Sequence, residues 1–199
     1  MKILALDSSG LVASVAVVEN DTLLAEYTVN YKKTHSQTLL PMLDEISNMT
    51  ELDLSTIDAI AVAGGPGSFT GLRIGSATAK GLGLALEKPL ISIPTTAAIA
   101  YNIWDTDKFV CPIMDARRNQ VYTGVYCYTD HRLDTVWEQD TMSIEALAEG
   151  LNCLDHEVIF PRGRRCGLPG KIRGTADDSV FLCTGTRQPP ESGSRRSTG

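Results

Sequence analysis

The sequence predicts an α/β protein, because strand and helix patterns alternate along the chain. Over residues 2–93 a short apolar strand, a hairpin, an amphipathic helix, a strand, a helix and a strand follow one another. The junction at residues 59–80 is the strongest single indication, since an apolar strand there enters a helix of small residues through a glycine-rich turn. With 199 residues, 43% of them hydrophobic, the chain is long enough for one domain or two small lobes.

The first strands are expected at the start of the chain. Residues 2–8 are an apolar run typical of a buried strand. Residues 12–18 and 22–31 predict a hairpin that turns at Asn20 and Asp21.

An amphipathic helix is expected from Ser36, because apolar residues recur there every three or four positions. Pro41 fits only in the first turns of such a helix. The other elements that we expect in this half are strands at residues 58–63 and 89–93 and helices at residues 71–88 and 95–104.

A second lobe is expected from near Phe109. Residues 109–114 and 121–128 predict a hairpin around a turn, residues 143–151 a helix and residues 158–160 a strand.

The last part of the chain differs in composition. Gly, Pro, Ser and Arg make up 22 of the 39 residues from Pro161 onward, a mixture that cannot bury enough apolar surface to order itself. We therefore expect one lobe at residues 1–105, a second and incomplete lobe at residues 106–160, and an atypical tail at residues 161–199 that is disordered or translated from a shifted reading frame.

Charge and cysteine usage restrict the function. Residues 1–160 contain 10 Lys and Arg against 21 Asp and Glu, and this acidic composition argues against a protein that binds nucleic acid by itself.

The five cysteines are scattered and form no Cys-x-x-Cys pair, which favours reduced thiols over a disulfide or zinc framework. No signal or membrane-spanning segment is recognisable, so we expect a cytoplasmic protein.

The glycine-rich turn is a candidate anion site. Free N–H groups at a helix N-terminus can bind a phosphate, although Leu72 and Arg73 stand where a P-loop has Lys and Ser or Thr. Arg73 could close such a site. A tight turn without a ligand is the alternative interpretation. The residues that we expect in a vestigial nucleotide or anion site here are Gly65, Gly67, Ser68, Thr70, Gly71 and Arg73.

Asp7, Ser8 and Ser9 could complete that site, because a carboxylate and two hydroxyls at the end of a strand can serve a metal-bound phosphate. The alternative is a capping turn. His35 is a lone histidine before a helix, which is more often a surface or capping residue than a catalyst. The sequence contains no His-x-x-x-His, no Gly-x-Ser-x-Gly and no Cys/His constellation, so we expect no catalytic residue and no metal site.

A stripe of small residues lines the helix behind the turn. Gly71, Gly75, Ala79 and Gly83 fall at four-residue steps, and glycine inside a helix costs about 1 kcal/mol relative to alanine. The stripe therefore predicts close packing, either against a partner's helix or against this chain's own sheet.

Four segments together resemble the TsaB (YeaZ) family: residues 4–9, 35–41, 63–75 and 114–122. The resemblance covers residues 1 to about 160, and the tail departs from it. It implies an actin-like, RNase-H-type (ASKHA) fold of two lobes with mixed sheets. It also implies a role in making threonylcarbamoyladenosine at adenosine 37 of tRNAs that decode ANN codons, as a non-catalytic subunit that supports the transferase TsaD.

The resemblance further implies partners and an interface. The partners are TsaD, TsaE through the complex, tRNA indirectly and, without TsaD, a second copy of the chain in a homodimer. The family binds TsaD through two helices, which suggests interface residues His35, Leu39, Leu43, Ile46, Gly71, Gly75, Ala79 and Gly83. No cofactor is required, and binding of ATP or ADP is expected to be weak.

Two other functions fit the sequence less well. One is an active ATP-dependent phosphotransferase or ATPase of the same fold that uses Asp7 with the loop at residues 65–71. The other is a glycoprotease-like hydrolase, which we disfavour because the sequence offers no nucleophile and base pair.

Overall fold

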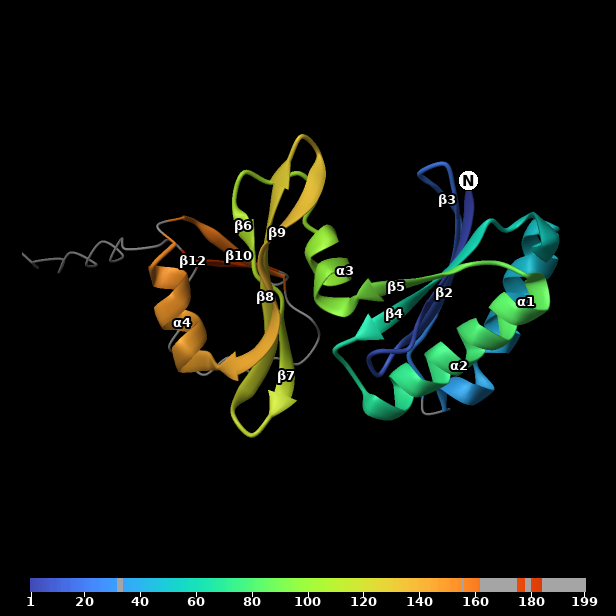
Figure 1. Ribbon diagram of the computed structural model, residues 1–199, viewed down its shortest axis with the longest axis horizontal. Coiled ribbons are helices and arrows are strands. Elements are labelled where there is room, and N and C mark those ends of the chain that lie inside the picture. The colour runs from blue at the N-terminus through green and yellow to red at the C-terminus, as the bar shows by residue number, and fades with distance from the viewer. Residues whose placement is uncertain (32–33, 155, 162–174, 178–179, 184–199) are drawn as a thin grey trace, which may run out of the picture. The chain divides into compact units, whose positions relative to one another are not determined.

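The computed structural model describes residues 1–31, 34–154, 156–161, 175–177 and 180–183 (Figure 1). The chain divides into two compact units, Met1–Asn102 and Ile103–Gly199, close to the boundary predicted at residue 105. No helix in the described part of the chain is long and apolar enough to cross a membrane.

A five-stranded mixed sheet forms the centre of the first unit. Its strands are β1 (Lys2–Asp7), β2 (Ala13–Glu19), β3 (Thr22–Val29), β4 (Ala59–Gly65) and β5 (Leu90–Pro94), in the order β3-β2-β1-β4-β5. The first three strands are antiparallel to one another, whereas β4 and β5 run parallel to β1. The predicted hairpin turn is confirmed: Asn20 and Asp21 have φ of 45° and 67°, which suits the twist of the two strands.

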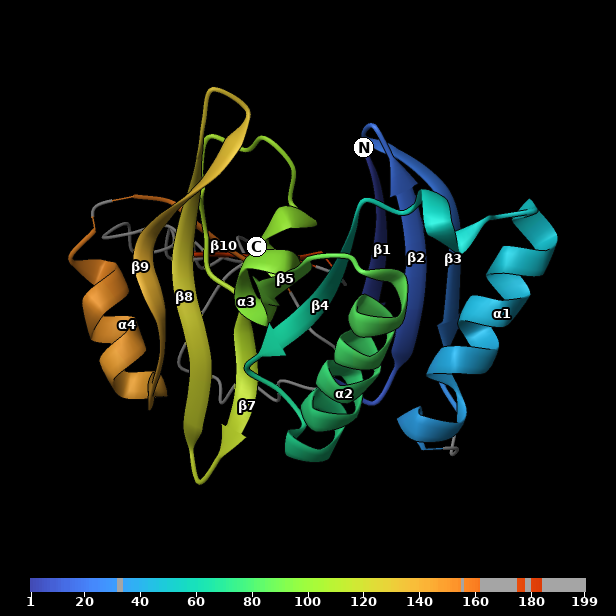
Figure 2. The same cartoon turned by 45° about the vertical axis from the view of Figure 1, so that its right-hand side comes forward.

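Two helices cover one face of this sheet, α1 (Leu39–Thr50) and α2 (Phe69–Leu86) (Figure 2). Pro41 lies in the first turn of α1, where the missing N–H costs no helix hydrogen bond. The unit also contains α3 (Thr95–Tyr101) and two short 3-10 turns at His35–Gln37 and Leu54–Thr56. The core between helices and sheet contains Leu4, Leu6, Val15, Val17, Leu39, Met42, Leu43, Ile46, Ile57 and Ile60.

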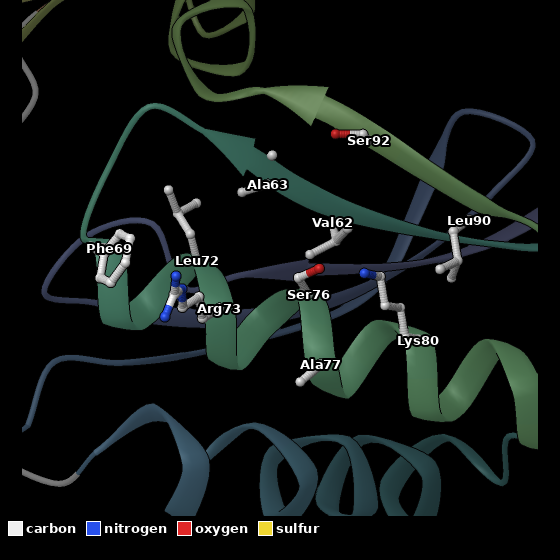
Figure 3. Close-up of a pocket in the computed structure, with 11 residues that line it drawn as sticks. Val62, Ala63, Phe69, Leu72, Arg73, Ser76, Ala77, Lys80, Leu90 and Ser92 are labelled. Atoms are coloured by element: carbon white, nitrogen blue, oxygen red, sulfur yellow. The ribbon is translucent and has the colours of Figure 1, made fainter.

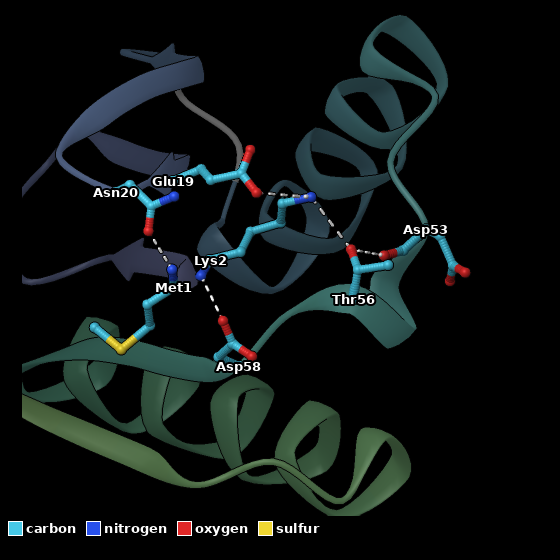
Figure 4. Close-up of polar contacts among 7 residues, drawn as sticks. All are labelled: Met1, Lys2, Glu19, Asn20, Asp53, Thr56 and Asp58. Carbon is cyan, nitrogen blue, oxygen red and sulfur yellow. Dashed lines mark hydrogen bonds and ion pairs between the residues drawn. The ribbon is translucent and has the colours of Figure 1, made fainter.

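Polar contacts fix the start of β1 to the segments beside it (Figure 4). The backbone N–H of Lys2 donates to Asp58 Oδ2 at 2.7 Å, and Lys2 Nζ lies 3.6 Å from Glu19 Oε1 and donates to Thr56 Oγ1 at 3.3 Å. Asp53 caps the turn before β4 by accepting from the Ser55 N–H, a hydrogen bond that lowers the pKa of the Asp53 carboxyl. The first strand is thereby held in register with β2 and β4.

The second unit repeats the topology of the first. Its elements are β6 (Phe109–Val110), β7 (Ile113–Arg117), β8 (Gln120–Thr129), β9 (Arg132–Ser143), α4 (Ile144–Asn152), β10 (Val158–Pro161), β11 (Thr175–Asp177) and β12 (Val180–Cys183). Both β6 and β7 pair with β8 and act as one interrupted strand, flanked by β8 and β9 on one side and by the parallel β10 on the other. The order β9-β8-β6-β10 matches β3-β2-β1-β4, so the predicted two-lobed RNase-H-type, actin-like fold with mixed sheets is confirmed.

The fifth strand distinguishes the two units. In the first unit β5 is parallel to β4, whereas in the second β12 is antiparallel to β10 and pairs with β11. Both β11 and β12 come from the stretch for which we predicted an atypical tail. The rest of that prediction falls on residues 162–174, 178–179 and 184–199, which lie outside the described residues, and it stays a prediction.

The long strand β9 was missed by the sequence analysis. It has 12 residues, pairs with β8 alone among the described strands and is exposed along most of its length. Because little of it is buried, its sequence shows no clear apolar alternation. The turn between β7 and β8 is also shorter than predicted, since β7 extends to Arg117 and β8 begins at Gln120.

The core of the second unit contains a buried thiol. Cys111 is fully buried beside Ile113, Val125 and Leu147, and its Sγ lies 3.2 Å from Thr123 Oγ1. Burial raises the pKa of the Cys111 thiol to about 12. This thiol therefore stays protonated and unreactive in the folded chain.

Cys111 should make the free energy of unfolding depend on pH in the alkaline range. The thiol ionises near its ordinary value of 9.0 in the unfolded chain but only near 12 when folded, so the unfolded state holds fewer protons between these values. Stability from this group is complete below pH 9 and is lost as the pH rises toward 12. Urea denaturation of the wild type should show a steeper decline than Cys111→Ser, by at most about 1.4 kcal/mol per pH unit. Equal slopes would contradict the burial of this thiol.

Candidate functional site

The glycine-rich turn between β4 and α2 packs directly on the end of β1. The Ser68 N–H donates to the Ser9 carbonyl at 2.6 Å, and Ser8 Oγ donates to the Gly71 carbonyl at 2.8 Å. A Cβ at Gly67 would lie 2.5 Å from the Ser9 carbonyl oxygen, and one at Gly71 would overlap the Ser8 carbonyl. The structure thus brings together the two segments that the sequence analysis assigned to one site, and only glycine fits at these two contacts.

The first turn of α2 uses its own chain as a cap. Ser68 is the N-cap residue, and its Oγ accepts from the Gly71 N–H at 3.3 Å. Together with the Ser68 N–H bound to Ser9, two of the donors that the predicted anion site would offer are already satisfied within the chain.

Arg73 packs against Phe69 in the first turns of α2. Its guanidinium carbon lies 3.9 Å from the centre of the Phe69 ring, a cation–π contact. In this structure the side chain follows the helix surface and packs on Phe69, and the expectation that Arg73 completes an anion cradle stays a prediction.

Asp7 and His35 stabilise the same corner. Asp7 Oδ1 accepts from the Ser9 N–H at 2.8 Å, which is the capping turn considered as an alternative. His35 Nε2 lies 3.0 Å from the Gly10 carbonyl oxygen. Because a carbonyl only accepts, this nitrogen carries the proton, and His35 joins the start of α1 to the loop after β1.

The small-residue stripe of α2 faces inward. Gly71, Gly75, Ala79 and Gly83 are all buried, and a Cβ at Gly83 would lie 2.8 Å from Leu90 Cδ2. The prediction that this stripe docks a partner is wrong, and the alternative of packing on the chain's own sheet is confirmed. The close approach of helix and strands leaves no room for a second molecule.

The predicted interface residues of α1 are also internal. Leu39, Leu43 and Ile46 have exposed fractions of 1%, 4% and 4% and belong to the core of the first unit. Of the residues proposed for the interface, His35 alone keeps part of its surface exposed. The expected contact surface on these helices therefore has to consist of other side chains.

The outer sides of α1 and α2 expose large apolar residues instead. Leu84 and Phe69 of α2 are 83% and 68% exposed, and Met49 and Leu40 of α1 are 79% and 52% exposed. We call this set, with Ala77, the outer helical surface. The sequence does contain its signal, because Phe69, Arg73, Ala77, Lys80 and Leu84 recur at steps of four, four, three and four residues.

A groove of about 650 Å³ lies between α2 and the strands β4 and β5 (Figure 3). Val62, Leu72 and Leu90 give it an apolar lining, and Arg73 and Lys80 are the charged residues that border it. Of the residues in the predicted anion site, Arg73 alone lines this groove.

The hairpin turn between β7 and β8 reproduces one detail of the first unit. Asp115 Oδ1 accepts from the Arg117 N–H at 2.7 Å, the same two-residue step as from Asp7 to Ser9. Asp7 is the last residue of β1, and Asp115 lies two residues before the end of β7. The equivalence of the two turns supports the repeated topology.

Within the described ranges no group of three or more His, Cys, Asp or Glu side chains is placed to hold a metal ion. The clearest histidine and carboxylate pair is His131 Nδ1 with Asp105 Oδ2 at 2.6 Å, on the surface of the second unit.

Comparison with known proteins gives the family. The family model described as TsaD, tRNA N6-adenosine threonylcarbamoyltransferase, matches residues 22–169. The chain is 36% identical over 160 residues to the tRNA threonylcarbamoyladenosine biosynthesis protein TsaB of Bacillus subtilis, covering 80% of this chain and 70% of that protein. It is 37% identical over 128 residues to TsaB of Escherichia coli, covering 63% of this chain and 55% of that protein.

A solved structure agrees with these matches. YeaZ from Pseudomonas aeruginosa aligns with a TM-score of 0.63 and 31% identity over 71% of this chain and 67% of that one. The chain thus spans little more than half of one TsaB relative and about two thirds of the others. From these matches together with the two-lobed fold, the chain belongs to the TsaB (YeaZ) family.

Proposed function

We propose that this chain is a non-catalytic subunit that supports TsaD in transferring the threonylcarbamoyl group to adenosine in tRNA. Membership of the TsaB family supports a role in the biosynthesis of threonylcarbamoyladenosine in tRNA. The observation that supports a binding role over a catalytic one is the filled turn between β4 and α2. Ser8 and Ser9 lie in the space that a nucleotide phosphate would need, and the Ser68 and Gly71 N–H groups that could bind it already have partners.

The outer helical surface is the proposed docking surface for TsaD. α1 and α2 lie side by side and expose Leu40, Met49, Phe69 and Leu84, and each such side chain contributes about 1.5–3 kcal/mol when it is fully buried. Large exposed apolar side chains on adjacent helices are typical of interaction surfaces. This surface replaces the buried residues that the sequence analysis had assigned to the same interface.

The same surface would serve a homodimer in the absence of TsaD. On its exposed side α1 presents Asp44 and Glu45, whereas α2 presents Arg73 and Lys80. In a two-fold dimer, α1 of one copy can face α2 of the other, which would pair opposite charges between the apolar residues near the two ends of each helix. We place the complex in the cytoplasm, with TsaE joining through it and tRNA reaching this chain through its partner.

A substitution on the outer helical surface tests the docking proposal. Leu84→Asp should leave the fold intact, since this side chain is 83% exposed, but should weaken binding to TsaD at least tenfold because it places a charge where an apolar side chain would be buried. Calorimetric titration with TsaD measures the affinity. Leu11→Asp is the matched control, because Leu11 is 71% exposed in the loop after β1 and should bind normally. Equal affinities for the two variants would refute this interface.

The rival function, an ATP-dependent phosphotransferase or ATPase, is tested with the purified chain. Asp7 keeps an exposed carboxylate that could serve bound magnesium, which is the feature that favours this rival. We expect no ATP turnover and only weak binding of ATP or ADP, because the Ser68 and Gly71 N–H groups already have partners. Turnover that Asp7→Asn abolishes would overturn the non-catalytic assignment.

A further inference from the structure

The turn between β7 and β8 combines exposed cations with an unfavourable backbone. Arg117, Arg118 and Asn119 have φ of 66°, 52° and 59°, three consecutive left-handed residues. Such turns favour Asn and Gly, whereas an arginine is strained there. The turns at Asn20–Asp21 and Asp130–His131 also have positive φ but use shorter side chains. Strained residues are retained more often at functional sites than elsewhere, so this turn invites a functional explanation.

The two arginines of this turn point to no ion-pair partner in the part of the chain that the structure describes. No ion pair among the described residues involves Arg117 or Arg118, and both are exposed. The adjacent Asp115 binds the Arg117 backbone N–H through one carboxylate oxygen. Residues 103–161 contain four Lys and Arg against eleven Asp and Glu, so half of the basic residues of this segment are at one turn.

The next two residues extend the same chemistry. Asn119 and Gln120 are exposed as well, so four consecutive side chains at the tip carry hydrogen-bond donors and none is apolar. Arginine forks match phosphate oxygens, and Asn and Gln amides also contact the backbone of nucleic acids. A protein partner's interface would require an apolar centre that this tip lacks.

We propose that the basic turn, residues 117–120, contacts the phosphodiester backbone of tRNA in the complex with TsaD. This inference rests on the proposed function. The contact positions RNA without reading its sequence, because phosphate groups carry no base identity. The net charge of −6 keeps the free chain a poor RNA binder, so the turn acts when a partner brings the RNA close.

Salt-dependent binding of tRNA to the assembled complex tests the proposal. The affinity falls as the salt concentration rises, and each phosphate contact contributes about 0.7–0.9 to the magnitude of the slope of log affinity against log salt. Arg118→Gln should therefore reduce the magnitude of this slope by about that amount. Arg132→Gln is the matched control: it removes the same charge at the start of β9, which pairs with Thr129 at the other end of β8 from the basic turn, and should leave the slope unchanged (Figure 2). Equal changes of the slope in the two variants would show that net charge alone causes the effect, and would overturn the proposal.

A glycine variant separates contact from structure. Arg118→Gly should raise the melting temperature, because glycine adopts the positive φ without strain, and should still lower the salt slope. An unchanged slope would overturn the proposal.

Gel filtration of the same samples with TsaD distinguishes an RNA contact from a protein contact at this turn. Loss of TsaD binding by Arg118→Gln would make the turn a protein contact and overturn the proposal. Failure of the wild type itself to bind TsaD would instead refute the proposed function. The RNA contact proposed here, which rests on that function, would then be overturned with it, whereas an unchanged slope in a complex that does form would overturn the RNA contact alone.

Discussion

The packing of α2 against the end of β1 is the contact on which the rest of the first unit depends. The Ser8 carbonyl lies where a Cβ of residue 71 would be, and the hydrogen bonds from Ser8 Oγ to the Gly71 carbonyl and from the Ser68 N–H to the Ser9 carbonyl close the gap between strand and helix. This contact fills part of the space at the glycine turn and engages the Ser68 N–H group. It also fixes the rotation of α2, so that its glycine stripe faces the sheet and Phe69 and Leu84 face solvent.

The two units share one topology but differ where the fifth strand is added. Each unit joins an antiparallel three-stranded meander to a parallel fourth strand through a helix, α1 in the first unit and α4 in the second. In the first unit α2 then returns the chain to a parallel fifth strand, whereas β12 is antiparallel to β10. The departure falls beyond the part of the chain that the TsaD family model matches, which is residues 22–169.

Most of the fold could be predicted from the sequence, because buried strands and amphipathic helices leave regular apolar patterns. The exception among the long elements was β9, an exposed strand whose order comes from pairing with β8 and not from its own burial. The site was predicted less well. The sequence places Asp7, Ser8 and the glycine turn near one another but does not show that Ser8 and Ser9 fill the turn. Nor can four-residue spacing alone decide whether a glycine stripe faces a partner or the sheet, a choice made here by the Ser8 contact.

Two alanine substitutions in α2 test this account most directly. A methyl group at Gly71 would overlap the Ser8 carbonyl, whereas one at Gly81 meets no atom within 4 Å. Urea denaturation should show that Gly71→Ala lowers the free energy of unfolding by about 1–3 kcal/mol and that Gly81→Ala raises it by roughly 0.5–1 kcal/mol. Equal stabilities for the two variants would contradict the close contact between α2 and β1, and with it the assignment of the glycine stripe to the interior.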